Sequence, residues 1–248
     1  MIDTPPSSPR ARIWTRTLTL QWRSAVSHVR GRIDALERLD EAFEIEAFMA
    51  GENRAGVLLG DDGVYEFRLE SSSLHVAART PTPDMDFLME VVEIGLRGFA
   101  FDAYGQRAAF THLAPLPLDY EAARRSAAEQ LMGRATATMG LEDFSLLVDG
   151  ETMGVPYQAE VGVISSAEMP ERVTGRRGRL DPEYHPVPAV TDPEMVPEVG
   201  FFMDSRWNMP AGPDVGAGEL FQWWTDVAAI ADQLVEQLVT LVDDTVDR

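Results

Sequence analysis

The sequence predicts an α+β fold of two similar antiparallel-sheet halves, each followed by a helix, with a long C-terminal helix. Three observations lead to this fold class. Short apolar runs alternate with polar residues, which is typical of strands, and other segments repeat apolar residues at helical spacing. The order of strands followed by a helix also occurs twice in 248 residues, a length that exceeds the roughly 100 to 150 residues of a typical domain.

The first half is expected over residues 11–105, after a proline-rich arm at residues 1–10 that has the composition of a disordered segment. Its predicted elements come in the order strand 13–22, helix 26–39, strands 43–49, 55–59, 64–69 and 74–78, and helix 84–99. Asp61, Asp62 and Gly63 form a hairpin turn signal between two of these strands.

The second half, residues 106–248, repeats this order loosely. Its predicted elements are strand 108–113, helix 118–132, strands 144–148, 157–164 and 199–207, and a closing helix over 217–247. Asp149 and Gly150 supply the expected turn signal between the strands at 144–148 and 157–164. Segments 64–69 and 199–204 each precede a proline-containing loop and then a helix, which favours an internal duplication.

The chain contains no lysine and no cysteine, so all 21 of its cationic side chains are arginines. This composition excludes a phosphate-loop lysine, a Schiff base, a thiolate nucleophile, a disulfide framework and a cysteine zinc site. Arginine in place of lysine is typical of a GC-rich genome. Selection against an amine that accepts acetyl, methyl or ubiquitin-like groups would also remove lysine, and so would adaptation to a high-salt cytoplasm.

Acidic residues dominate the charge, because 41 carboxylates against 21 arginines leave a formal net charge of −20. A field of this sign repels nucleic acid and anionic membranes and favours basic partners. No apolar run approaches the length of about 18 residues that a membrane span needs, and the first residues lack the apolar core of a signal peptide. We therefore expect a cytoplasmic protein without a cofactor.

One basic cluster interrupts this acidic composition. It consists of Arg172, Arg176, Arg177 and Arg179, with two glycines among them. Guanidinium groups of this kind suit contact with an acidic partner or a phosphate, whereas four charges are few for nucleic acid. A solvated loop of arginines is the alternative interpretation.

The stretch at 180–199 combines prolines with potential metal ligands, namely Asp181, Glu183, His185, Asp192, Glu194 and Glu198. Their spacing fits no known metal loop, and the repeated Asp-Pro-Glu favours two turns in a solvated segment. The remaining histidines, His28, His75 and His112, lie far apart in the sequence, without metal spacing or an adjacent serine elbow. We predict no catalytic, cofactor-binding or metal-binding residue.

The final predicted helix repeats apolar residues every seven positions, at Leu220, Val227, Leu234 and Leu241, with a second series at Trp224, Ala231 and Leu238. Further apolar residues widen this stripe, so the helix either packs across a sheet or buries a second face on a partner. Core packing is the simpler interpretation. The candidate partner contacts are Trp223, Trp224, Leu234 and Leu238, and a homodimer is one arrangement that would use them.

Two strand-rich halves that each end in a helix, with Phe201-Phe202-Met203-Asp204 before a final helix containing Leu220-Phe221-Gln222-Trp223-Trp224, give the chain a recognisable pattern. This pattern resembles a sporadically distributed family of uncharacterised bacterial proteins and, more distantly, SecB-type chaperones. The SecB resemblance implies an acidic, cytosolic, non-enzymatic oligomer that holds unfolded client proteins on apolar grooves. The length and the duplication differ from a single SecB unit.

These observations favour a non-enzymatic, acidic protein-binding module. It would act as a chaperone, an antitoxin-like or immunity-like partner, or an assembly component, and its partner would be another protein that is basic or partly unfolded. The alternative is a small hydrolase built on carboxylates and histidine and assisted by a metal at residues 181–198.

Overall fold

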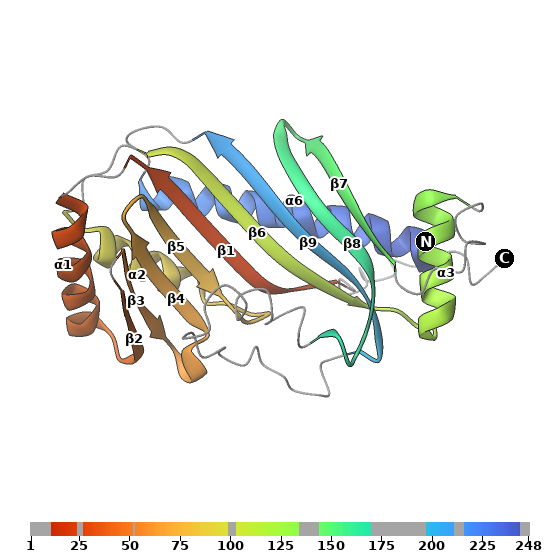
Figure 1. Cartoon of the computed structure of the whole chain (residues 1–248), viewed down its shortest axis with the longest axis horizontal. Coiled ribbons are helices and arrows are strands. Elements are labelled where there is room, and N and C mark those ends of the chain that lie inside the picture. The colour runs from red at the N-terminus through yellow and green to blue at the C-terminus, as the bar shows by residue number, and fades with distance from the viewer. Residues whose placement is uncertain are drawn as a thin grey trace, which may run out of the picture.

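The computed structural model describes residues 11–23, 27–51, 53–98, 103–133, 144–169, 197–210 and 216–243. Within these ranges the chain is an α+β protein with one large antiparallel sheet and a long C-terminal helix (Figure 1), as predicted. The arm at 1–10, the four clustered arginines and most of the acidic stretch, including His185, lie outside the described residues.

The described residues of the first half form five strands and two α-helices. Their bounds are β1 (Arg12–Trp22), α1 (Ser27–Ala42), β2 (Ile45–Gly51), β3 (Arg54–Leu59), β4 (Tyr65–Glu70), β5 (Ser73–Ala78) and α2 (Met85–Leu96). The turn signal at Asp61–Gly63 forms a short 3-10 helix between β3 and β4, as expected. Asp84 caps α2, because its side chain accepts a hydrogen bond from the backbone N–H of Phe87 at 2.9 Å.

The second half comprises β6 (Ala103–Pro115), α3 (Tyr120–Met132), β7 (Ser145–Thr152), β8 (Val155–Ser165), β9 (Val199–Pro210) and α6 (Ala217–Asp243). The turn predicted at Asp149 and Gly150 is wrong. Both residues lie inside β7, and the chain reverses at Met153 and Gly154, whose φ angles are 50° and 78°. Gly150 is needed for packing, because a Cβ there would lie 2.7 Å from the ring of its cross-strand neighbour Tyr157.

The nine strands of the described ranges form one sheet, in the order β2-β3-β4-β5-β1-β6-β9-β8-β7, with antiparallel neighbours throughout. The first strands of the two halves, β1 and β6, pair with each other from Arg12↔Leu113 to Trp22↔Ala103. Strand pairing therefore joins the halves, and the predicted boundary at residue 105 falls near the start of β6. β2 and β7 are the two edges of the sheet.

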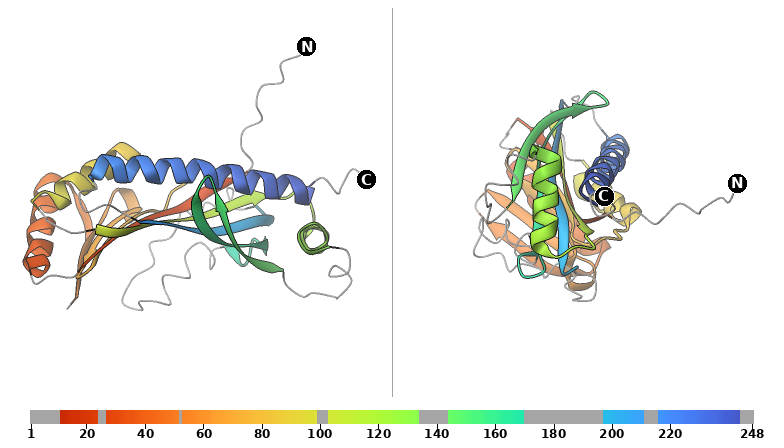
Figure 2. Two further views of the ribbon diagram at one scale, coloured as in Figure 1. Left: turned by 90° about the horizontal axis from the view of Figure 1, so that it is seen from above. Right: turned by 90° about the vertical axis from the view of Figure 1, so that its right-hand side faces the viewer.

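The main core lies between one face of the sheet and α6, which runs along that face (Figure 2). α6 contacts the central strands β1, β6 and β9, and also α2 and α3. Alternate strand residues such as Leu18, Phe110 and Trp207 supply the sheet side of this core, and Val235 is one of the buried residues of α6. Complete burial of one such side chain stabilises the fold by roughly 1.5 to 3 kcal/mol.

A smaller apolar cluster lies on the opposite face of the sheet. Its members are Trp14, Leu113, Ile164, Met169 and Phe202. Leu113 and Phe202 alternate with residues of the main core along β6 and β9, so they point away from α6. Trp14 joins them because the β1–β6 register shifts between Ile13 and Thr15, which leaves Ile13 facing the main core.

No helix in the described ranges is both long and apolar enough to cross a bilayer.

Candidate functional site

The four α6 residues named from the sequence divide between two environments. Trp224 is completely buried in the main core, where its ring lies edge-on to Phe221 with centroids 5.4 Å apart. Trp223, Leu234 and Leu238 are only partly buried at the margin of the same core. Trp224 therefore offers no surface to a partner in this fold, whereas the other three keep part of theirs exposed.

The seven-residue series along α6 leaves the core as the helix proceeds. Leu220 and Val227 are buried, Leu234 is partly buried, and Leu241 is 49 % exposed. On a straight helix a seven-residue repeat drifts by about 20° per repeat, so its later members turn away from the sheet. Leu234 and Leu241 belong to a second apolar row on this side of the helix. We call this row the α6 flank, and it consists of Trp223, Ile230, Leu234, Leu238 and Leu241.

Polar contacts on the other side of α6 determine where the α6 flank points. The Nε2 of His112 in β6 donates to Oδ1 of Asp232 at 3.0 Å, and the backbone N–H of Ala11 donates to Oε1 of Glu236 at 2.7 Å. Ala11 directly precedes β1, so Asp232 and Glu236 face the β1 side. At 3.6 residues per turn the α6 flank lies on the opposite side of the helix, toward β9, β8 and β7.

A partly buried arginine, Arg16, lies near the same carboxylate of Asp232. Burial lowers the pKa of Arg16 in β1, and the nearby carboxylate of Asp232 partly offsets this effect. His112 is fully buried, whereas the side chain of Asp232 remains 48 % exposed. Asp232 thus brings a negative charge to the two central strands and holds α6 in one orientation across the sheet.

The β7–β8 hairpin curls toward α6 on the side that the α6 flank faces (Figure 2). No residue of β7 is fully buried, although Leu146 and Val148 touch the main core. Val155 and Tyr157 of β8 are also partly buried there, and Tyr157 stacks on Trp207 with ring centroids 4.7 Å apart. One side of the molecule therefore has two incompletely buried apolar rows, one from the helix and one from the hairpin.

The opposite face of the sheet holds a charged network around the buried Glu66 of β4. Glu66 accepts a hydrogen bond from Arg79, and its Oε1 lies 3.2 Å from Nη1 of Arg68 and 3.9 Å from Nε2 of His75. Thr19 Oγ1 lies 3.4 Å from Nδ1 of His75. Hydrolases use this order of hydroxyl, imidazole and carboxylate, but these two histidine distances are too long for strong hydrogen bonds. Two guanidinium groups also hold the carboxylate, which suits a cross-strand structural role.

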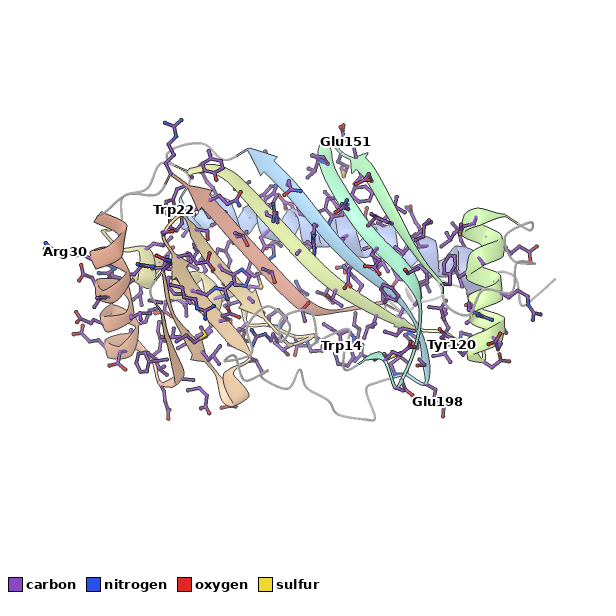
Figure 3. The ribbon with its side chains drawn as sticks, viewed as in Figure 1. Trp14, Trp22, Arg30, Tyr120, Glu151 and Glu198 are labelled. Carbon is purple, nitrogen blue, oxygen red and sulfur yellow. The ribbon has the colours of Figure 1, made fainter. Side chains whose placement is uncertain are left out.

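An open pocket of about 690 Å³ lies where α3 begins, lined by residues 116–120, Ser166 and residues 197–199. Figure 3 places Tyr120 and Glu198 at this end of the molecule. The second carboxylate of the pocket, Asp119, caps α3 by accepting from the backbone N–H of Ala122 at 2.8 Å. No histidine occurs in this lining. Among the residues that the structure describes, no three His, Asp or Glu side chains form a potential metal site.

Sequence reasoning missed the carboxylate neighbours of two histidines. His75 meets Glu66 through the pairing of β4 with β5, and His112 meets Asp232 across 120 residues of sequence. No local sequence motif indicates either of these two contacts. Comparison with known protein families gives no match for this chain, and neither does comparison with curated individual proteins. The resemblance to SecB-type chaperones therefore stays a prediction.

Proposed function

We propose that the chain is a non-enzymatic protein-binding module that holds another protein on the α6 flank and the β7–β8 hairpin. The observation that carries the proposal is the second apolar row of α6, which includes Trp223, Ile230 and Leu234. A helix that only closes its own core needs one apolar face, and α6 already has a fully buried one. Incompletely buried apolar rows beside polar residues are typical of interaction surfaces.

The charge of the chain supports a basic partner. A formal charge of −20 speeds the encounter with a positively charged protein and makes their association sensitive to salt. The resemblance to SecB-type chaperones agrees with an acidic binding protein for partly unfolded clients. A cytoplasmic location belongs to the same proposal, since a chain without cysteine suits a reducing compartment.

A second copy of this chain is the alternative occupant of the α6 flank. Light scattering at micromolar concentration distinguishes a different protein from a second copy. A monomeric chain leaves the α6 flank available to a different protein. A hydrolase based on carboxylate and histidine gains no support from the network around Glu66, where two arginines already engage the carboxylate.

The test compares two substitutions on the same helix. Leu234→Ser removes a partly buried side chain of the α6 flank, and Thr225→Ser changes an exposed residue on the opposite side of the same helix. Tagged forms of the full chain are cross-linked in the cells that produce it, and the captured proteins are quantified by mass spectrometry. We expect one captured partner whose recovery is unchanged with Thr225→Ser and about tenfold lower with Leu234→Ser, because a buried leucine contributes roughly 1.5 kcal/mol or more.

Thermal denaturation of both variants controls for loss of fold. Equal recovery of every captured protein by two folded variants would contradict the proposal. So would hydrolytic activity of the purified chain that His75→Ala or His185→Ala removes.

A further inference from the structure

The two edges of the nine-stranded sheet are built differently. β2 has a register shift against β3 between Ile45 and Ala47, and irregularities of this kind hinder the addition of another strand. β7 pairs with β8 along its whole length, from Ser145↔Gly162 to Thr152↔Val155, without a shift. β7 also contains no proline, a residue that often blocks an edge. It is therefore a regular edge that a further strand fits.

Alternate backbone groups of β7 point away from β8. The N–H of Val163 donates to the C=O of Phe144 at 3.3 Å, so these two residues form a hydrogen-bonded pair. Such pairs recur at every second residue of an antiparallel ladder. The even-numbered residues of β7 therefore bond to β8, and the residues that direct their N–H and C=O outward are Ser145, Leu147, Asp149 and Glu151. Over the described ranges no strand pairs with this outer side.

The same alternation sorts the side chains of β7 into two rows. Leu146 and Val148 face the α6 side and are partly buried against the main core. Leu147, Asp149 and Glu151 face the other side and are exposed, with Glu151 at the outer end of the hairpin (Figure 3). A strand added here would set every second side chain beside an apolar row and the others beside two carboxylates.

We propose that β7 accepts an extended segment of a partner protein as a tenth strand, and that this segment alternates apolar residues with arginine or lysine. The inference rests on the proposed function and names the chemistry of the partner. Main-chain hydrogen bonds to β7 supply the affinity, and the two side-chain rows supply the specificity. A second copy fits less well, because β7–β7 pairing would gather four exposed carboxylates and join two chains of charge −20 each.

The test needs a matched pair of variants at one outward-pointing residue. Leu147→Pro removes the outward N–H but leaves the β7–β8 ladder intact, because residue 147 does not donate to β8. Leu147→Ala shortens the same side chain and keeps the N–H. The probes are two eight-residue peptides, one alternating arginine with valine and one alternating glutamate with valine. Their binding to the full chain is measured by calorimetry at about 0.15 M salt, where distant charges are screened.

We expect the arginine–valine peptide to bind the unmodified chain and Leu147→Ala within about threefold of each other. Leu147→Pro should bind it about tenfold or more weakly, since a main-chain hydrogen bond is lost and the ring obstructs the edge. The glutamate–valine peptide should not bind. If Leu147→Pro does not fold, Ser145→Pro against Ser145→Ala repeats the comparison at another outward-pointing N–H.

Equal affinity of the arginine–valine peptide for the proline and alanine variants overturns the inference, because the attraction is then electrostatic only. A captured partner that depends on Leu234 but not on the N–H of Leu147 also overturns it, while the proposed function stands. A captured partner whose binding depends neither on Leu234 nor on the N–H of Leu147 contradicts both the proposed function and this inference. A dimer of the unmodified chain that Leu147→Pro converts to monomer replaces the proposed partner with a second copy.

Discussion

Removal of the Asp232 carboxylate should destabilise the fold by about 2 to 3 kcal/mol, although half of that side chain is exposed. The change leaves the fully buried His112 without the acceptor that lies 3.0 Å from its Nε2, and an unsatisfied buried donor costs roughly 1 to 3 kcal/mol. It also removes a negative charge near the partly buried guanidinium of Arg16, and the interaction of such a partly solvated pair is worth on the order of 1 kcal/mol. Water reaching the site keeps the total below the 3 to 5 kcal/mol typical of a broken, fully buried ion pair.

Urea denaturation at neutral pH measures this loss. Asp226→Ala is the matched control, because Asp226 is an exposed residue of the same helix that accepts from Gln222 at 2.8 Å, and its loss should cost no more than about 0.5 kcal/mol. The double variant with His112→Leu should show a coupling energy of about 1 kcal/mol or more. Two results would refute the role given to Asp232 in holding α6 on the sheet. One is an equal loss of stability from Asp232→Ala and Asp226→Ala, and the other is strict additivity of Asp232→Ala with His112→Leu.

Three further predictions concern backbone geometry. Gly95→Ala should destabilise the fold by roughly 1 to 3 kcal/mol in thermal denaturation, because the new Cβ would stand 2.5 Å from Cζ of Phe67. Gly218→Ala, at a helical position with nothing within 4 Å, should instead stabilise it by up to about 1 kcal/mol, and a loss of stability there would contradict the packing described for α6. Met153→Asn should stabilise the hairpin by about 1 kcal/mol, since asparagine tolerates a φ of 50° better than methionine, and an unchanged urea midpoint would argue against strain at this turn.

The elements of the fold were predictable because burial imposes a period on the sequence. The alternation in β1 and the helical spacing in α2 follow directly from which side chains face the main core. The turn in the β7–β8 hairpin was not predictable in this way. Asp149 and Gly150 carry a strong local turn signal, but the space that Tyr157 requires over Gly150 comes from pairing with a different strand.

The candidate site depends still more on information that local patterns lack. The heptad series names Leu234 as part of a stripe, but only the fold shows that the series leaves the core before Leu241. The contrast between the irregular edge β2 and the regular edge β7 depends on register, which two strands determine jointly. The same holds for the contact between His112 and Asp232, because it needs the sheet and α6 together.

The central position of β1 has a consequence for folding during synthesis. Its neighbour β5 leaves the ribosome roughly 50 to 60 residues after it and its other neighbour β6 roughly 80 to 100 residues after it, so at 5 to 20 residues per second β1 waits about 4 to 20 seconds for both. Until β5 emerges, Leu18, Leu20 and Trp22 have neither a strand partner nor α6 to cover them. Such distant pairing also slows folding in general. Among the described strands, the one that ends in the middle of the finished sheet therefore waits longest for its first partner, and during that wait it is open to wrong pairing.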